Sequence, residues 1–107
     1  MTACIVGGSH LRLGKSEDDV EDMVTKVAIE AIRDAGCEPK DVDSIFLGHF
    51  GGAFSPQGFT SSLVLQATPE LRFKPAMRVE NACATGLSLI HISEPTRQAE
   101  ISYAVFC

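Results

Sequence analysis

Basic clusters are missing from this chain of 107 residues, in which 9 Lys and Arg face 14 Asp and Glu, for a net charge of -5. Nucleic-acid binding is disfavoured, because neutralising phosphates requires grouped cationic side chains. No apolar run approaches the ~20 residues that cross a bilayer, so we expect no membrane partner. The N-terminus also lacks the charged region and long apolar stretch of a secretory signal.

Closely spaced cysteines are missing too. The four cysteines, at positions 4, 37, 83 and 107, form no Cys-x-x-Cys pair and no zinc-site pattern with the three histidines. We therefore expect no metal, and a reduced cytoplasmic compartment rather than a disulfide scaffold. The hydrophobic content of 45% is sufficient for one small globular domain.

The clearest helix is predicted to begin near Ser16 and to stop at Gly36. Ser16 is expected to cap the first turn, and the acidic residues after it suit the positive end of a helix. Asp22 and Lys26 are expected to pair on the wet face. One apolar stripe with helical spacing runs through the segment and comprises Val20, Met23, Val24, Val27, Ala28, Ala31 and Ile32.

Short apolar segments bounded by turn residues predict strands at 3–6, 43–48 and 75–79. A second, short helix is predicted at 60–67, bounded by Pro69. The resulting β-α-β-α-β order indicates an α/β fold with a mainly parallel sheet and covering helices. The third strand leads into Cys83, where the next helix should begin.

Cys83 is the candidate nucleophile of the chain. A thiolate at a helix N-terminus is stabilised by the macrodipole and by free backbone N–H groups, so we expect a lowered pKa and raised reactivity. The small neighbours Ala82, Ala84 and Gly86 would let a bulky thioester approach the backbone. Asn81 is expected to cap the helix or to hold this loop through its side chain. The alternative is a small buried cysteine in a tight turn.

Residues 80–86, Glu-Asn-Ala-Cys-Ala-Thr-Gly, resemble the acylation-cysteine motif of the thiolases, the acetyl-CoA acetyltransferases. The resemblance implies the N-terminal half-domain of a thiolase-like layered fold. It implies a cytoplasmic acyltransferase of lipid metabolism that forms an acyl-cysteine at Cys83 from a coenzyme A thioester. That acyl-CoA is a substrate, and no separate cofactor is expected. The full-length parent would be a homo-oligomer. The Cys83 N–H is a plausible oxyanion donor, since helix-start amides are unpaired.

Two alternatives to a thiolase stay open: a ketoacyl-synthase-type condensing enzyme, and a non-catalytic thiolase-like subunit that binds a partner protein. Sequence beyond Gly86 would separate the three. A Gly-His-Pro segment with a second Cys would indicate a thiolase, and two His or His and Asn would indicate a condensing enzyme. The absence of both would indicate the non-catalytic subunit. A histidine beside Cys83 would suggest a catalytic dyad. However, neither His10 nor His49 lies in a thiolase motif.

Residues 87–107 depart from this pattern. Positions 87–97, Leu-Ser-Leu-Ile-His-Ile-Ser-Glu-Pro-Thr-Arg, resemble the in-frame translation of a sequencing-library adapter, and positions 101–107 resemble a second adapter segment. We therefore expect a partial thiolase domain at 1–86 and a non-native tail at 87–107, in which Pro95 ends any helix begun near Cys83. The alternative is a genuine C-terminus with a strand at 101–106. With the supporting helix missing or replaced, and with the activating His and the second Cys missing, we expect an inactive, poorly folded fragment.

Overall fold

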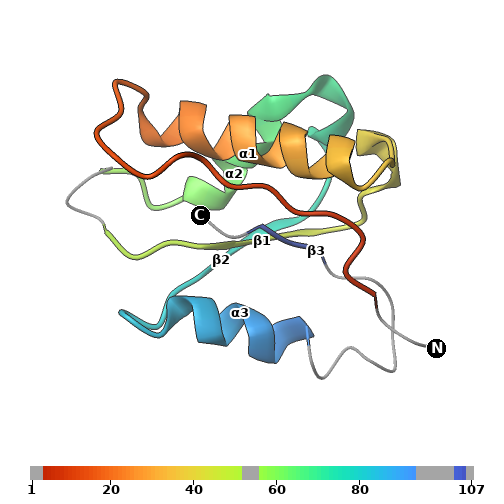
Figure 1. The fold of residues 1–107 in the computed structure, drawn as a ribbon. Helices are drawn as coiled ribbons and strands as arrows, with labels where there is room; N and C mark the ends of the chain where they lie inside the picture. The colour runs from red at the N-terminus through yellow and green to blue at the C-terminus, as the bar shows by residue number, and fades with distance from the viewer. Residues whose placement is uncertain (1–3, 52–55, 94–102, 106–107) are drawn as a thin grey trace.

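Three short parallel strands, in the order β2-β1-β3, form the sheet of the computed structural model, which describes residues 4–51, 56–93 and 103–105. The strands are β1 (Ile45–Gly48), β2 (Ala76–Val79) and β3 (Tyr103–Val105), and the helices are α1 (Val20–Asp34), α2 (Thr60–Leu63) and α3 (Thr85–Ser93). In Figure 1, α1 and α2 lie on one side of the sheet and α3 on the other. The predicted α/β class is confirmed.

The central strand β1 carries the core. Its register pairs Ile45 with Ala76 on one edge and with Tyr103 on the other. Leu47 is 1% exposed and packs with residues of α1 and of the segment that follows α2. That segment is the 3-10 helix η2 (Val64–Ala67), so the predicted helix at 60–67 exists but tightens halfway along. Short 3-10 turns at Pro39–Asp41 and Pro69–Leu71 complete the connections.

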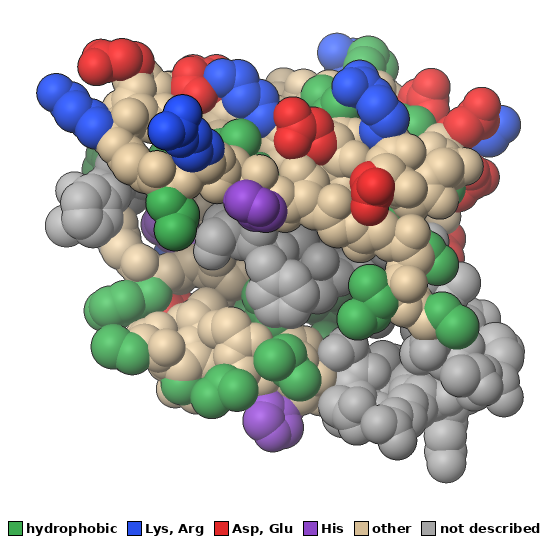
Figure 2. All heavy atoms as spheres, in the orientation of Figure 1, with side chains coloured by type: hydrophobic (Ala, Val, Ile, Leu, Met, Phe, Trp, Pro, Cys, Tyr) green, Lys and Arg blue, Asp and Glu red, His purple; other side chains and the backbone are tan. Residues whose placement is uncertain are grey.

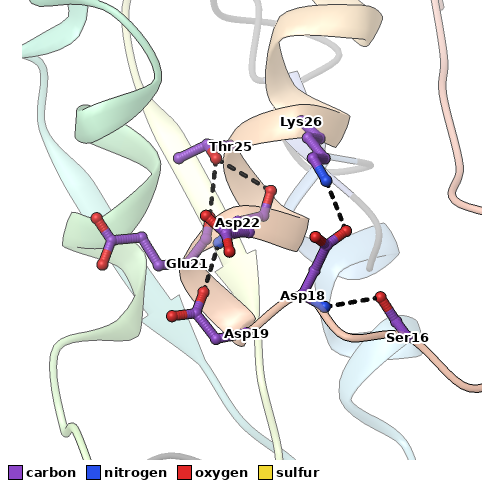
Figure 3. Close-up of polar contacts among 7 residues, drawn as sticks. All are labelled: Ser16, Asp18, Asp19, Glu21, Asp22, Thr25 and Lys26. Atoms are coloured by element: carbon purple, nitrogen blue, oxygen red, sulfur yellow. Dashed lines mark hydrogen bonds and ion pairs between the residues drawn. The ribbon is translucent and has the colours of Figure 1, made fainter.

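The apolar stripe of α1 faces the core as predicted, with Val24, Val27 and Ala28 buried. The predicted start was wrong. The helix begins at Val20 and is capped by Asp19, whose Oδ1 accepts from the Asp22 N–H at 2.8 Å (Figure 3). Ser16 instead accepts from the Asp18 N–H at 3.1 Å and shapes the loop before the helix. Ser16 and Asp19 can both cap a helix, and Asp19, which directly precedes the first residue of α1, is the cap.

The predicted pairing of Lys26 with Asp22 was also wrong. Lys26 Nζ lies 2.6 Å from Asp18 Oδ2 (Figure 3). Asp18 precedes the helix, so its carboxylate is free to reach the Lys26 face. The hydrogen bond from Lys26 to Asp18 raises the pKa of Lys26, and the charges of Asp18, Asp22 and Glu30 act in the same direction. Because the pair is exposed, it adds little to stability.

The N-terminal strand predicted at 3–6 is absent from the described residues 4–6. Ile5 is 99% exposed and Val6 is 50% exposed, whereas a central strand would have buried both. The edge of β1 that such a strand could use is taken by β3. The strand β3 falls within the range 101–106 that the alternative of a genuine C-terminus predicted to be a strand, while the non-native origin of residues 87–107 stays a prediction.

The two faces of the molecule differ in character. Figure 2 shows Lys, Arg, Asp and Glu side chains gathered over α1, while hydrophobic side chains predominate over α3. On α3, Leu87 is 58% exposed and Ile90 is 45% exposed. Within the described residues, no helix has the length and apolar character needed to cross a membrane.

Candidate functional site

Cys83 lies between the end of β2 and the start of α3, as the sequence predicted. This is the carboxyl edge of the parallel sheet, where α/β folds place their ligand sites. The thiol is free and Cys83 is exposed. The alternative of a buried structural cysteine is therefore wrong.

The turn that carries Cys83 is tightly wound. Ala82 has φ of 45°, a left-handed conformation that residues other than glycine rarely adopt. The Ala84 N–H donates to the Asn81 carbonyl at 2.9 Å, and the Thr85 N–H donates to the Ala82 carbonyl at 3.2 Å. Two successive turns thus lift Cys83 out of the line of β2 just before α3 begins.

Thr85 is the residue of this site that the sequence analysis missed. Its Oγ1 accepts from the Asn81 N–H at 2.9 Å and donates to the Ala82 carbonyl at 2.7 Å. The predicted role of the Asn81 side chain was wrong, since among the described residues that side chain forms no hydrogen bond. A threonine at the first residue of a helix was the available signal, because short hydroxyl side chains bond to nearby backbone groups.

Gly48, the last residue of β1, allows α3 to approach the sheet. A Cβ built on Gly48 would lie 2.9 Å from Thr85 Cγ2 and 2.8 Å from Leu89 Cδ1. Any larger residue would push the first turns of α3 away from β1. The missing side chain at Gly48 therefore sets the distance between the sheet and the helix that follows Cys83.

Neither His10 nor His49 forms a hydrogen bond with Cys83 among the described residues. The His49 N–H donates to the Val79 carbonyl at 3.1 Å, and its Nδ1 is buried without a partner among the described residues. His10 Nδ1 lies 3.1 Å from the Leu11 carbonyl. Both line an open groove of about 1360 Å³ between the loop before α1 and the end of β1. The described residues therefore contain no hydrogen-bonded dyad of either histidine with Cys83.

Cys4 and Cys37 are the other two cysteines among the described residues. Cys4 is exposed, which overturns its predicted place in a buried strand. Cys37 is half-buried and its Sγ donates to the Ile32 carbonyl at 3.8 Å, so it packs at the end of α1. Cys107 lies outside the described residues. Glu80 pairs with Arg78 at 3.0 Å, next to the turn.

Comparisons with known proteins agree with the motif around Cys83. No family model matches the chain. The acetyl-CoA acetyltransferase of Methanothermobacter thermautotrophicus is 37% identical over 84 residues, which cover 77% of this chain. The acetyl-CoA acetyltransferase of Methanocaldococcus jannaschii is 30% identical over 84 residues. The chain belongs to the thiolase family.

The thiolase match covers only part of each relative. The chain spans 22% of the length of the first acetyltransferase and 21% of the second. Among solved structures, the 3-oxoacyl-[acyl-carrier-protein] synthase III of Aquifex aeolicus matches with a TM-score of 0.63 and 26% identity, over 79% of this chain and 27% of that one. The thiolase-like fold is therefore established, and the condensing-enzyme alternative remains compatible with it.

Proposed function

We propose that this chain is the nucleophile-bearing segment of an acyl-CoA acyltransferase, with Cys83 as the acylated residue. The observation that carries the proposal is the exposed thiol at the β2–α3 junction of a thiolase-family chain. Ala82, Ala84 and Gly86 keep the backbone around it uncrowded. The substrate would be a coenzyme A thioester, in keeping with the activity named for its archaeal relatives.

The chemistry proposed for Cys83 has two steps. Its thiolate forms a bond to the acyl carbonyl carbon, and collapse of the tetrahedral intermediate expels coenzyme A as a thiolate. A carbanion of a second acyl-CoA then attacks the acyl-cysteine, which releases the Cys83 thiolate. During each attack, the Cys83 N–H near the start of α3 would donate to the developing oxyanion.

We further propose that these 107 residues alone do not turn over substrate. The motif resemblance assigns proton transfer to a histidine in a Gly-His-Pro segment and to a second cysteine, and the chain contains no Gly-His-Pro segment. His10 and His49 form no hydrogen bond with Cys83 in the described residues and so do not substitute for them. The boundary between native sequence and adapter-like tail is proposed at Gly86, inside α3. The 84 aligned residues of the relatives support a native part of that size.

An assay of acetoacetyl-CoA thiolysis on the purified chain tests this part of the proposal. We expect no release of acetyl-CoA above the rate of a Cys83→Ala variant. A rate that depends on Cys83 would contradict the proposed inactivity. Reading the gene past Gly86 tests the parent activity: a Gly-His-Pro segment with a second cysteine supports a thiolase, and two His or His and Asn support a condensing enzyme. The cytoplasmic location and the oligomeric parent stay predictions.

A further inference from the structure

We propose that Thr85 is a positioning residue for Cys83, an inference that rests on the proposed function of that thiol. One hydroxyl contacts both residues that precede Cys83. It accepts from the Asn81 N–H at 2.9 Å and donates to the Ala82 carbonyl at 2.7 Å. The 80–81 and 82–83 peptide units, which flank Asn81 and Ala82, are thereby fixed to the first residue of α3.

The conformation that Thr85 holds is one that would otherwise relax. Ala82 at φ 45° is disfavoured for an L-residue with a Cβ, so the turn needs contacts that specify it. Without the hydroxyl, Ala82 can return to negative φ, and the direction of the Cys83 side chain then changes. The thiol would then no longer project from the turn in the same direction.

Thr85 is itself held in place. It is 9% exposed, and the Cβ position of Gly48 lies 2.9 Å from its Cγ2 methyl. A β-branched side chain in a helix has few χ1 rotamers, so seating the methyl against β1 aims the hydroxyl at the turn. Thr85 therefore links the sheet to the nucleophile through one side chain.

The test is the alkylation rate of Cys83 by iodoacetamide in the full chain, followed by peptide mass mapping. Thr85→Val keeps the shape and removes the hydroxyl. We expect the Cys83 rate to fall by about fivefold, which corresponds to the loss of one to two ordinary hydrogen bonds. The Cys37 rate, read in the same sample, should stay constant. Thr85→Ser retains both hydrogen bonds and should restore the Cys83 rate.

Thr60→Val is the matched control. Thr60 is 0% exposed, and its hydroxyl has no partner among the described residues, so the same change there should leave the Cys83 rate unaltered. An unchanged rate in Thr85→Val would overturn the proposal without bearing on acyl transfer, because alkylation needs no acyl-CoA.

Ala82→Gly distinguishes a positioning role of Thr85 from a contribution of Thr85 to the overall stability of the chain. Glycine adopts positive φ without penalty, so the effect of Thr85→Val should shrink at least twofold when residue 82 is glycine. If Thr85→Val unfolds the chain, as shown by a raised Cys37 rate, Ala82→Gly should restore folding. Unfolding or slow alkylation that glycine does not relieve would contradict the positioning role.

A second inference stands on the sheet alone: we infer that residues 4–6 and β3 compete for one edge of β1. β1 pairs with β2 on one side and with β3 on the other, so each of its edges has one occupant. A strand that precedes α1 and connects through it to β1 would lie parallel to β1 in the same sheet. β3 is parallel to β1 and fills that place.

The N-terminal segment already runs in the direction of such a strand. Gly7 lies so close to Ala35 that a Cβ on Gly7 would be 2.5 Å from Ala35 N. The Gly8 N–H donates to Asp34 Oδ2 at 2.9 Å, and Ser9 Oγ donates to Glu30 Oε2 at 2.9 Å. The segment is thus antiparallel to α1, and Figure 1 shows it passing along the helix.

Burial of apolar side chains would favour the replacement of β3 by residues 4–6. Ile5 is 99% exposed and Val6 is 50% exposed where they stand, although both are β-branched residues that suit a sheet. Moving residues 4–6 onto β1 would bury these side chains, because α1 and α3 cover the two faces of the sheet. The N-terminal segment is therefore the proposed occupant of this edge whenever β3 is displaced.

Amide hydrogen exchange on the full chain tests the competition. Two prolines, Tyr103→Pro with Ala104→Pro, remove whichever β3 amide donates to β1. We expect exchange at Ile5 and Val6 to slow by about tenfold or more, as these residues enter the sheet. The control pair Tyr103→Thr with Ala104→Thr keeps both amides and should leave exchange at Ile5 and Val6 fast.

Two outcomes would overturn the competition. One is unchanged exchange at Ile5 and Val6 in the double-proline variant while α1 stays protected. The other is loss of protection throughout α1, which would mean that β3 is required for folding and that residues 4–6 cannot replace it. If residues 4–6 replace β3 in the double-proline variant, adding Ile5→Pro should raise the hydrogen-exchange rates of the β1 amides.

Discussion

Cys83→Ser is expected to lower acetyl transfer on the order of 10⁴-fold in a chimera that carries this chain's aligned segment within the Methanothermobacter acetyltransferase. The chimera is the required background, because the chain spans only 22% of that relative. A hydroxyl near neutral pH is a far weaker nucleophile than a thiolate, and the acyl-enzyme should no longer form. Steady-state thiolysis, with intact-protein mass spectrometry of the acetyl adduct, measures both effects.

Cys37→Ser is the matched control for the chimera. Cys37 is half-buried and donates weakly to the Ile32 carbonyl, so serine there should leave thiolysis within about twofold. A chimera that is active with serine at position 83 would exclude Cys83 as the acylated residue. A chimera that folds but stays inactive with Cys83 intact would favour the non-catalytic, partner-binding alternative.

Leu47→Ala should reduce the free energy of unfolding by about 2–5 kcal/mol, because it removes a fully enclosed side chain and leaves a cavity. Leu47 is 1% exposed at the centre of β1 and packs against the buried faces of α1 and η2. A domain of this size is ordinarily stable by only ~5–15 kcal/mol, so the loss would remove a large share of its stability. Urea denaturation followed by circular dichroism gives the change in free energy.

Leu13→Ala is the matched control, because it makes the same truncation at a solvent-exposed position. Leu13 is 95% exposed, so we expect an effect within about 0.5 kcal/mol. Equal effects at positions 13 and 47 would contradict the core described around β1. Such a result would instead fit the expectation that the fragment is poorly folded.

The features that sequence alone predicted well are local ones. The stripe from Val20 to Ile32 predicted α1 and its buried face, since helical spacing brings those residues to one side regardless of what they pack against. Apolar runs beside turn residues predicted β1 and β2 to within two residues of their bounds. The position of Cys83 between a strand and a helix followed from these two elements.

The predictions that failed depend on choices between equivalent local partners. Ser16 and Asp19 can both cap a helix, and Asp18 and Asp22 can both reach Lys26. Local propensity does not rank such candidates, because the differences are a few tenths of a kcal/mol. The structure shows Asp19 as the cap and Asp18 as the partner of Lys26.

Sequence by itself determined the α/β class, the family, and the place of Cys83 in the order of elements. Only the tertiary structure decided that Thr85 forms hydrogen bonds with the turn before Cys83 and that Gly48 allows α3 to pack close to the sheet. It also decided that β3, and not residues 4–6, pairs with β1. The physical reason is that a strand edge accepts any chain of suitable direction. The occupant is chosen by the competing segments together, and no single stretch of sequence encodes that outcome.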